Sequence, residues 1–224
     1  MHDSWYRYRF SARAWQITLK LAEAVNSDEE IVLAASELLK LGWTLESSVL
    51  NRCQKLIETK ALVIQEEILF HLSVAWSKYF QHKFTESWQI LDEQVLRSPA
   101  LCSETPSKSI LLLISQANLL RSFLAVLPED LSNIPPSSDV GPVQAGVKAA
   151  QFGYTSLKCY VQYAQQQNGW DFYGQEWNAL RHFLSAAVNV ARVYLYTAAP
   201  REARFFLKEA LSAAQKHVSV LRYL

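Results

Sequence analysis

Residues 191–210 decide the fold, and they read ARVYLYTAAPREARFFLKEA. Pro200 is well placed to begin a helix, because it lacks the N–H that the first helical turn leaves unbonded. Ala191 before the turn and Ala203 after it are small enough to let two helix backbones approach closely. Tyr194 is an aromatic residue that can fill the wedge beside these alanines. The stretch therefore predicts two antiparallel α-helices joined by a short turn.

The same spacing is typical of tetratricopeptide (TPR) repeats, in which each repeat is one helical hairpin. The residues that fit the TPR pattern without a gap are Ala191, Tyr194, Ala203, Leu207 and Ala210. A looser match upstream uses Leu72 and Trp76 on a first helix and Leu91 on a second, with a longer turn between them. The alternative for both pairs is an ordinary helical hairpin with small residues at the crossing. Either interpretation predicts an all-α chain of antiparallel hairpins, stacked as a TPR-like superhelix.

Capping residues and apolar periodicity predict about nine helices. We expect Ser27 to be an N-cap with Glu30 completing a capping box, and Gly42 to end that helix in a left-handed conformation. We expect Thr105 to cap a later helix that has Pro106 at its first position. The expected helices are approximately Ser4–Val25, Ser27–Gly42, Thr44–Ile57, Leu62–Phe80, Phe84–Leu96, Thr105–Leu124, Val143–Gln167, Tyr173–Tyr196 and Pro200–Arg222.

Composition divides the chain into three parts. The stretch 128–142 contains four of the seven prolines and three serines, which predicts an exposed and mobile loop. The predicted organisation is N-terminal hairpins over residues 1–127, this loop, and three long helices over residues 143–224. The apolar stripe of the last helix continues to Leu224 without the polar face that ends a solenoid. We therefore expect the chain to be part of a larger protein.

The overall composition argues against several classes of function. Hydrophobic residues make up 50% of the chain, which predicts a globular fold, and the net charge of +1 gives no general attraction to nucleic acid or membranes. No apolar run reaches the length of a membrane span, and no secretory signal precedes the first helix. The three cysteines are odd in number and widely spaced, which favours reduced thiols in the cytoplasm or nucleus.

The sequence contains no recognisable catalytic or metal-binding motif. Cys53 and Cys159 occupy apolar positions on expected helices and Cys102 lies in an expected turn, so we interpret all three as structural thiols. No two of the five histidines are four residues apart, and neither CxxC nor HExxH occurs. The sequence therefore predicts no catalytic residue, no metal site and no cofactor, and we do not expect this chain alone to be an enzyme.

A cluster of arginines and aromatic residues lies near the N-terminus. Residues 5–10 read WYRYRF, and Arg13 follows them. Arginines interleaved with aromatic rings can bind single-stranded nucleic acid, so the patch Arg7–Arg13 is an alternative functional site. The spacing of three and four residues instead favours a helix whose aromatic side chains face inward and whose arginines face solvent.

Several stretches resemble the helical region of animal separases. These are FTESWQIL from Phe84, VLRSPAL from Val95, LLR from Leu119, LPEDLS from Leu127, WNAL from Trp177 and the hairpin containing Ala203 and Ala210. The resemblance covers about residues 66–215 in register, whereas residues 1–60 add little to it. In separases, features in this order belong to the superhelical, TPR-like part that precedes the protease domain.

The resemblance implies a non-catalytic scaffold of a caspase-like cysteine endopeptidase that cleaves cohesin at anaphase. An insect arrangement, in which the helical region is a separate chain, fits the same features. The implied partners are a securin-like inhibitory chaperone and the separase protease domain, with neither a membrane nor nucleic acid expected. The implied location is the cytoplasm and nucleus, at the spindle and centrosome. An unrelated TPR adaptor is the alternative, but it would need a carboxylate-binding Asn/Lys set, and the first-helix positions show none in the sequence.

Overall fold

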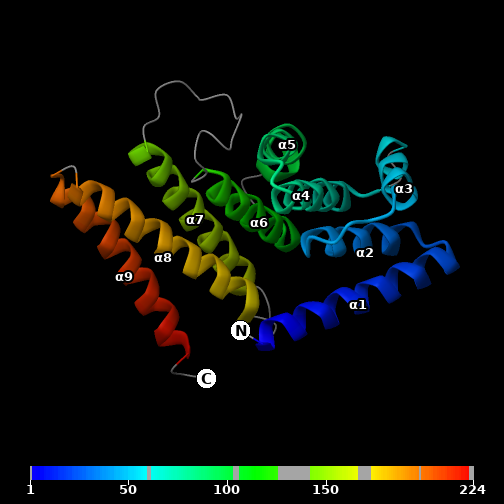
Figure 1. Cartoon of the computed structure of the whole chain (residues 1–224), viewed down its shortest axis with the longest axis horizontal. Coiled ribbons are helices and arrows are strands. Elements are labelled where there is room, and N and C mark those ends of the chain that lie inside the picture. The colour runs from blue at the N-terminus through cyan, green and yellow to red at the C-terminus, as the bar shows by residue number, and fades with distance from the viewer. Residues whose placement is uncertain are drawn as a thin grey trace. The chain divides into compact units, whose positions relative to one another are not determined.

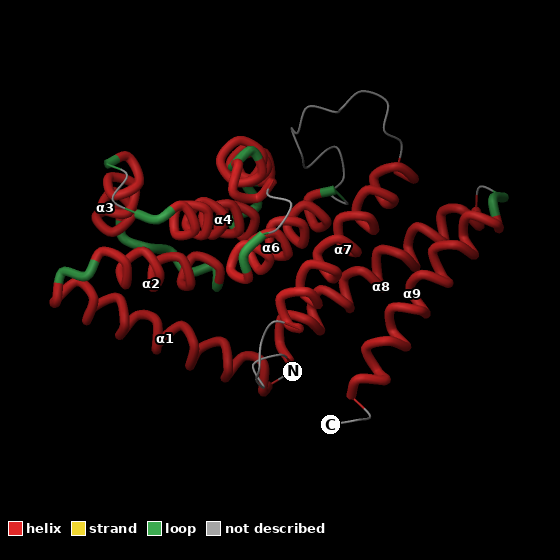
Figure 2. The backbone as a smooth tube through the Cα atoms, turned by 180° about the vertical axis from the view of Figure 1, so that it is seen from behind, coloured by secondary structure: helices red, strands yellow, loops and turns green. Residues whose placement is uncertain are grey.

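The computed structural model describes residues 2–59, 62–102, 106–125, 142–165, 173–196 and 198–221. Throughout these residues the ordered elements are helices, and no strand occurs among them (Figure 1). Figure 2 shows the same helices in red, with the described loops between them in green. The predicted all-α fold is therefore confirmed. The chain forms two compact units, Met1–Pro106 and Ser107–Leu224, which are described separately.

The first unit begins with three helices: α1 (His2–Val25), α2 (Asp28–Lys40) and α3 (Ser47–Glu58). It continues with α4 (Ile64–Phe80) and α5 (Phe84–Ile90), a π-helix (Leu91–Leu96) and a 3-10 turn (Pro99–Cys102). α1 packs on α2, α2 on both α3 and α4, and α4 on α5. This succession of neighbouring helices is solenoid-like, although α3 lies to the side and packs on α2 instead of α4.

The core of the first unit is built from helix faces with the predicted period. On α1, Ala12, Leu19 and Ala22 are buried and Trp15 packs partly against the core, whereas Arg13 is exposed. Most of the core comes from α2. Ile31 of this helix is fully buried, and so are the residues one turn farther along it. The prediction that the apolar stripe of α1 faces inward is therefore confirmed for its residues from Ala12 onward.

The second unit consists of α6 (Lys108–Leu124), α7 (Pro142–Gln165), α8 (Tyr173–Tyr196) and α9 (Pro200–Leu221). α7 packs on α6, α8 on α7 and α9 on α8. α6 and α7 are antiparallel, because Ser115 contacts Ser156 whereas Ser122, seven residues later, contacts Ala149, seven residues earlier. The stack is again solenoid-like, since each helix is covered by its neighbours in the sequence.

Small residues allow close contact at the crossing of α6 and α7. Ser115 Oγ donates to the carbonyl oxygen of Ser156 at 2.9 Å, and Ser156 Oγ donates to the carbonyl oxygen of Ser115 at 2.7 Å. Ser122 Oγ donates to the carbonyl oxygen of Ala149 at 2.6 Å. A Cβ at Gly153 would lie 3.3 Å from Ser122 Oγ, so glycine provides space for this hydroxyl. The serines therefore join the two backbones and leave no buried hydroxyl of their own unbonded.

The grouping of helices differs from the organisation predicted over residues 1–127 and 143–224. α6 belongs to the second compact unit, because its small face packs against α7, and the division falls between Pro106 and Ser107. Most of the predicted loop over residues 128–142 lies outside the described residues, and its last residue, Pro142, begins α7.

Four helices end with the same left-handed backbone motif. The residues with positive φ are Asn26, Gly42, His82 and Ala198. After each of them, a backbone N–H bonds to the carbonyl five residues back, as in Trp43 N–H to Leu38 O at 2.9 Å. The predicted left-handed end at Gly42 is confirmed, with φ of 73°.

Two predicted helix starts are wrong. The third helix begins at Ser47 and not at Thr44, because Leu45 is buried in the core of the first unit within a non-helical stretch. The sixth helix begins at Lys108, so Pro106 precedes it instead of occupying its first position. The carbonyl oxygen of Ser107 accepts the first bond of this helix, from Leu111 N–H at 2.9 Å. Thr105 lies outside the described residues.

Two further details of the helices differ from expectation. Ser27 occupies the N-cap position of α2, but its side chain makes no capping hydrogen bond, so the capping box with Glu30 is not formed. The predicted single helix over Phe84–Leu96 changes from α-helical to π-helical hydrogen bonding at Leu91. Leu91 and Val95 are nevertheless both fully buried, so the π-helix keeps an apolar face toward the core.

Candidate functional site

A groove runs along α8 in the second unit, and we call it the α8 groove. The described residues that line it are Leu180, Arg181, Leu184, Ser185, Val188, Asn189 and Arg192. The volume of the hollow is about 590 Å³. The hollow runs along α8 beside α9, and exposed side chains, among them Arg181, Ser185 and Arg192, open it to solvent.

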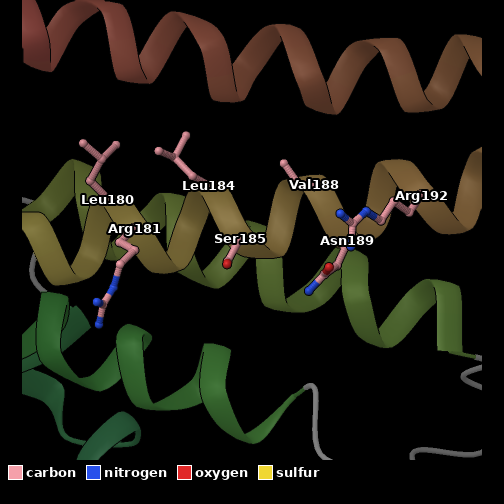
Figure 3. Close-up of a pocket in the computed structure, with 7 residues that line it drawn as sticks. All are labelled: Leu180, Arg181, Leu184, Ser185, Val188, Asn189 and Arg192. Atoms are coloured by element: carbon pink, nitrogen blue, oxygen red, sulfur yellow. The ribbon is translucent and has the colours of Figure 1, made fainter. Parts of the chain in front are cut away.

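The α8 groove has an apolar edge and a polar edge. Leu180, Leu184 and Val188, spaced four residues apart, point toward α9, whereas Arg181, Ser185 and Asn189 point the other way (Figure 3). Leu180 is buried in the core, Leu184 is partly buried, and Val188 is 36% exposed. The groove therefore offers both apolar contact area and hydrogen-bonding groups.

The charge of the groove is positive. Arg181 and Arg192 are both exposed, and among the described residues neither forms an ion pair. The helices α6–α9 together contain ten lysines and arginines against three glutamates. An anionic group that enters the groove would therefore meet unpaired guanidinium groups, which bind carboxylates well through two parallel hydrogen bonds.

Asn189 and Arg192 lie one turn apart on α8, with Arg181 farther along the same groove. These residues are three to eleven positions apart in the sequence and look like ordinary surface residues. Only the packing of α8 shows that they line one hollow.

The outer side of α9 adds an exposed apolar row. Leu207 and Leu211, one turn apart, are 43% and 58% exposed, and Arg204 and Lys208 lie next to them. Leu207 was predicted to pack between the helices of the TPR-like hairpin, so its position is a correction. Leu207 is exposed because α9 contacts the rest of the unit mainly through a narrow strip of buried alanines. The apolar stripe of α9 is broader than this strip, so its outer residues face solvent.

The other residues predicted to pack in the C-terminal hairpin lie in or beside the interface of α8 and α9. Ala191, Ala203 and Ala210 are buried. The ring of Tyr194 stacks on Phe206 with centroids 6.0 Å apart and an interplanar angle of 17°. The alanines and the tyrosine thus take the places that the spacing indicated, with Phe206 as an additional partner that the TPR pattern did not single out.

The looser upstream match lies in α4, α5 and the π-helix. Leu72 and Leu91 are fully buried, whereas Trp76 is partly buried and stacks on Phe80 with centroids 5.7 Å apart. Ser87 Oγ donates to the carbonyl oxygen of Ala75 at 2.7 Å, which holds α5 against α4. This hairpin is therefore closed by a hydroxyl-to-backbone contact like those between α6 and α7.

A serine and a histidine meet inside the second unit. Ser122 Oγ and His182 Nε2 are 2.7 Å apart, and the ring of Phe123 lies 4.0 Å from the imidazole, centroid to centroid. Because the Ser122 hydroxyl proton is donated to Ala149, the imidazole Nε2–H donates to Ser122 Oγ. The hydroxyl is buried and already bonded, so this pair is better suited to holding α6 and α8 together than to nucleophilic chemistry.

The pKa of His182 is lowered from its ordinary value. Burial is the main cause and the nearby Arg181 adds to it, while the hydrogen bond to Ser122 acts in the opposite direction. A lowered pKa in the folded state means that the unfolded chain binds a proton first as the pH falls. The stability that neutral His182 contributes is therefore complete above its ordinary pKa, and is lost as the pH falls toward the folded-state value.

We expect unfolding of the second unit to become easier as the pH falls below the ordinary histidine pKa of 6.5, with a slope of up to about 1.4 kcal/mol per pH unit for this proton. In His182→Gln this dependence should be weaker, because glutamine can still donate to Ser122 but does not titrate. Hydrogen exchange of the α6–α8 amides at several pH values measures both proteins. Parallel pH profiles for the wild type and the variant would contradict the assignment.

The described thiols are protonated at neutral pH. Burial raises the pKa of Cys53 to about 11 and also raises the pKa of Cys159. Neither sulfur forms a disulfide, and the side chain of Cys102 lies outside the described residues. Protonated buried thiols are weak nucleophiles, which fits the structural role predicted for Cys53 and Cys159.

Within the described part of the chain, no cluster of three or more histidine, cysteine, aspartate or glutamate residues could hold a metal ion. None of the described helices combines the length and the apolar character needed to cross a membrane.

The first unit has a hollow of its own, about 490 Å³ in volume, beside α1. Ile17 and Trp43, which line it, are 54% and 41% exposed. Arg13 also lines the hollow, together with cationic and anionic neighbours. Arg13 belongs to the patch Arg7–Arg13, in which the side chains of residues 7–10 lie outside the described residues.

Comparisons of the chain with protein-family models, with curated proteins and with solved structures give no match.

Proposed function

We propose that this chain is a non-catalytic helical scaffold that binds other proteins along the outer faces of α8 and α9. The observation that carries the proposal is the exposed apolar row of Leu207 and Leu211 together with the neighbouring α8 groove. Adjoining apolar side chains exposed to water are typical of surfaces that another protein covers. The flanking arginines and lysines give such a surface polarity and orientation.

The more specific form of the proposal is a scaffold segment of a separase-type complex. Its support is the resemblance of about residues 66–215 to the helical region of separases, and a stack of helical hairpins is compatible with that role. In this form the partners are a securin-like inhibitor and the protease domain, and the chain acts in the cytoplasm and nucleus. A TPR-type adaptor outside this family is the second candidate, and the carboxylate-binding groups of the α8 groove favour it.

Titration calorimetry with securin from the same organism tests the specific form. We expect binding to the wild-type chain, and an affinity weakened about tenfold or more in Leu207→Ser/Leu211→Ser, because apolar contacts near the centre of an interface contribute most to binding. Glu202→Ser/Glu209→Ser, which changes two exposed residues of the same helix, is the matched control and should bind normally. If securin produces no heat of binding, the separase role is wrong. Equal affinities for all three proteins would remove α9 from the interface.

A further inference from the structure

The α8 groove carries two arginines in a defined geometry. Arg181 and Arg192 are eleven residues apart, which is about three helical turns, so both project from nearly the same side of α8. Their Cα atoms are therefore separated by about 16 Å along the helix axis. Both side chains are exposed, and no carboxylate among the described residues pairs with either of them.

Between the arginines the groove changes from charged to apolar. Val188 is 36% exposed and Leu184 is partly exposed, and both lie between the two cations along the helix. Ser185 and Asn189 form the opposite edge (Figure 3). A ligand that matches this order of groups has a negative charge at each end and apolar side chains in the middle.

We propose that the α8 groove binds an acidic amphipathic helix of a partner protein. Two carboxylates of that helix, eleven residues apart on one face, pair with Arg181 and Arg192, and leucine-like side chains between them cover Leu184 and Val188. An α-helix is the favoured form of the partner. Residues eleven apart in an α-helix lie three turns apart on one face, and this spacing matches that of the two arginines on α8. The inference rests on the proposed scaffold function, and it names the chemistry of the partner.

The composition of the groove favours a protein over a nucleic acid. Arginines attract phosphates and carboxylates alike, but sequence-tolerant binding of single strands depends on aromatic side chains that stack on the bases. No aromatic residue is among the described residues that line the groove, and the two aliphatic side chains between the cations suit a leucine better than a sugar–phosphate backbone. Burial of these aliphatic groups also strengthens the neighbouring ion pairs, because it excludes water.

The test uses the full chain and a labelled helix-forming peptide of about 15 residues, a length at which an alanine-rich helix is marginally stable. The acidic probe has two glutamates eleven positions apart and two leucines between them, and the basic probe has lysines in place of the glutamates. We expect the wild-type chain to bind the acidic probe in fluorescence anisotropy and to bind the basic probe about tenfold more weakly or worse. Arg181→Glu/Arg192→Glu should reverse this preference.

The matched control is Lys158→Glu/Arg201→Glu, which makes the same change of charge at two exposed positions of the second unit that do not line the groove. It should keep the preference for the acidic probe, because charges outside the groove are screened over about 8 Å at physiological salt. Circular dichroism of both double variants checks that they fold. Since all four substituted residues are exposed, we expect wild-type helix content.

Each remaining outcome decides against the proposal. If both probes bind the wild type equally, or if Arg181→Glu/Arg192→Glu keeps the wild-type preference, the groove does not select acidic helices. If a labelled single-stranded oligonucleotide binds more tightly than the acidic probe and loses affinity in the same variant, the groove is a nucleic-acid site. The scaffold function is tested by a different experiment, the securin titration, which depends on Leu207 and Leu211. Securin can bind to the chain even if the acidic probe does not, so the two proposals can fail independently.

Discussion

Phe183→Ala should lower the free energy of unfolding of the second unit by about 3–5 kcal/mol, the usual cost of removing a buried phenylalanine ring. Phe183 is 3% exposed and lies in the cluster that joins α7, α8 and α9. Its ring is 5.4 Å from that of Tyr154, and its Cα would be 3.4 Å from a Cβ at Gly153. Because the backbones are already this close, the helices have little freedom to move together and fill the cavity.

The control for this variant is Phe205→Ala on α9. Phe205 is 59% exposed, so the same deletion should cost less than about 1 kcal/mol. Hydrogen exchange of the α7–α9 amides measures the two proteins under native conditions and assigns the effect to the second unit. If both variants lose the same stability, α8 does not pack through Phe183 as described.

Leu72→Ala should have a comparable effect on the first unit, about 2–5 kcal/mol. Leu72 is fully buried on α4, which packs on both α2 and α5, so a cavity at this position disturbs two helix interfaces. Leu21→Ala is the matched control, because Leu21 belongs to the same unit and is 61% exposed. Urea denaturation followed by circular dichroism compares the variants. A smaller loss in Leu72→Ala than in Leu21→Ala would contradict the packing of α4.

Helix positions were predictable because their signals are local. Gly42 ends α2 in the predicted left-handed conformation, and the predicted helix Tyr173–Tyr196 has the observed bounds. Where the prediction was wrong, a contact distant in the sequence decided the outcome. Thr44 looked like a helix start, but burial of Leu45 against other helices keeps that stretch non-helical.

The grouping of α6 with α7 could not be predicted for a different reason. The residues that join these helices include Ser115, Ser122, Ser156 and Gly153, which have little apolar surface and therefore leave no hydrophobic period. These residues stabilise the α6–α7 interface because small side chains let the two backbones approach closely. That effect can be recognised only once the positions of both helices are known.

The candidate site was only partly predictable. The alanines of the last hairpin were found because they follow a known spacing, whereas Leu207 was assigned to the same interface and is exposed. Apolar character alone does not distinguish a residue that faces another helix of the chain from one that faces solvent or a partner. The α8 groove was missed because Arg181, Asn189 and Arg192 carry no motif and line one hollow only once α8 has folded beside α9.

The hydroxyl-to-carbonyl contacts between helices bear on how such a sequence can diverge. Ser122 and Ser87 bind the carbonyl oxygens of Ala149 and Ala75, and every residue type has that oxygen. Substitutions at the accepting positions can therefore accumulate without loss of the hydrogen bond, provided that the new side chain fits. Only the serines and the small volume at the crossing are restricted. Two descendants of one ancestral stack could thus keep the same helix register while few of their residues remain identical.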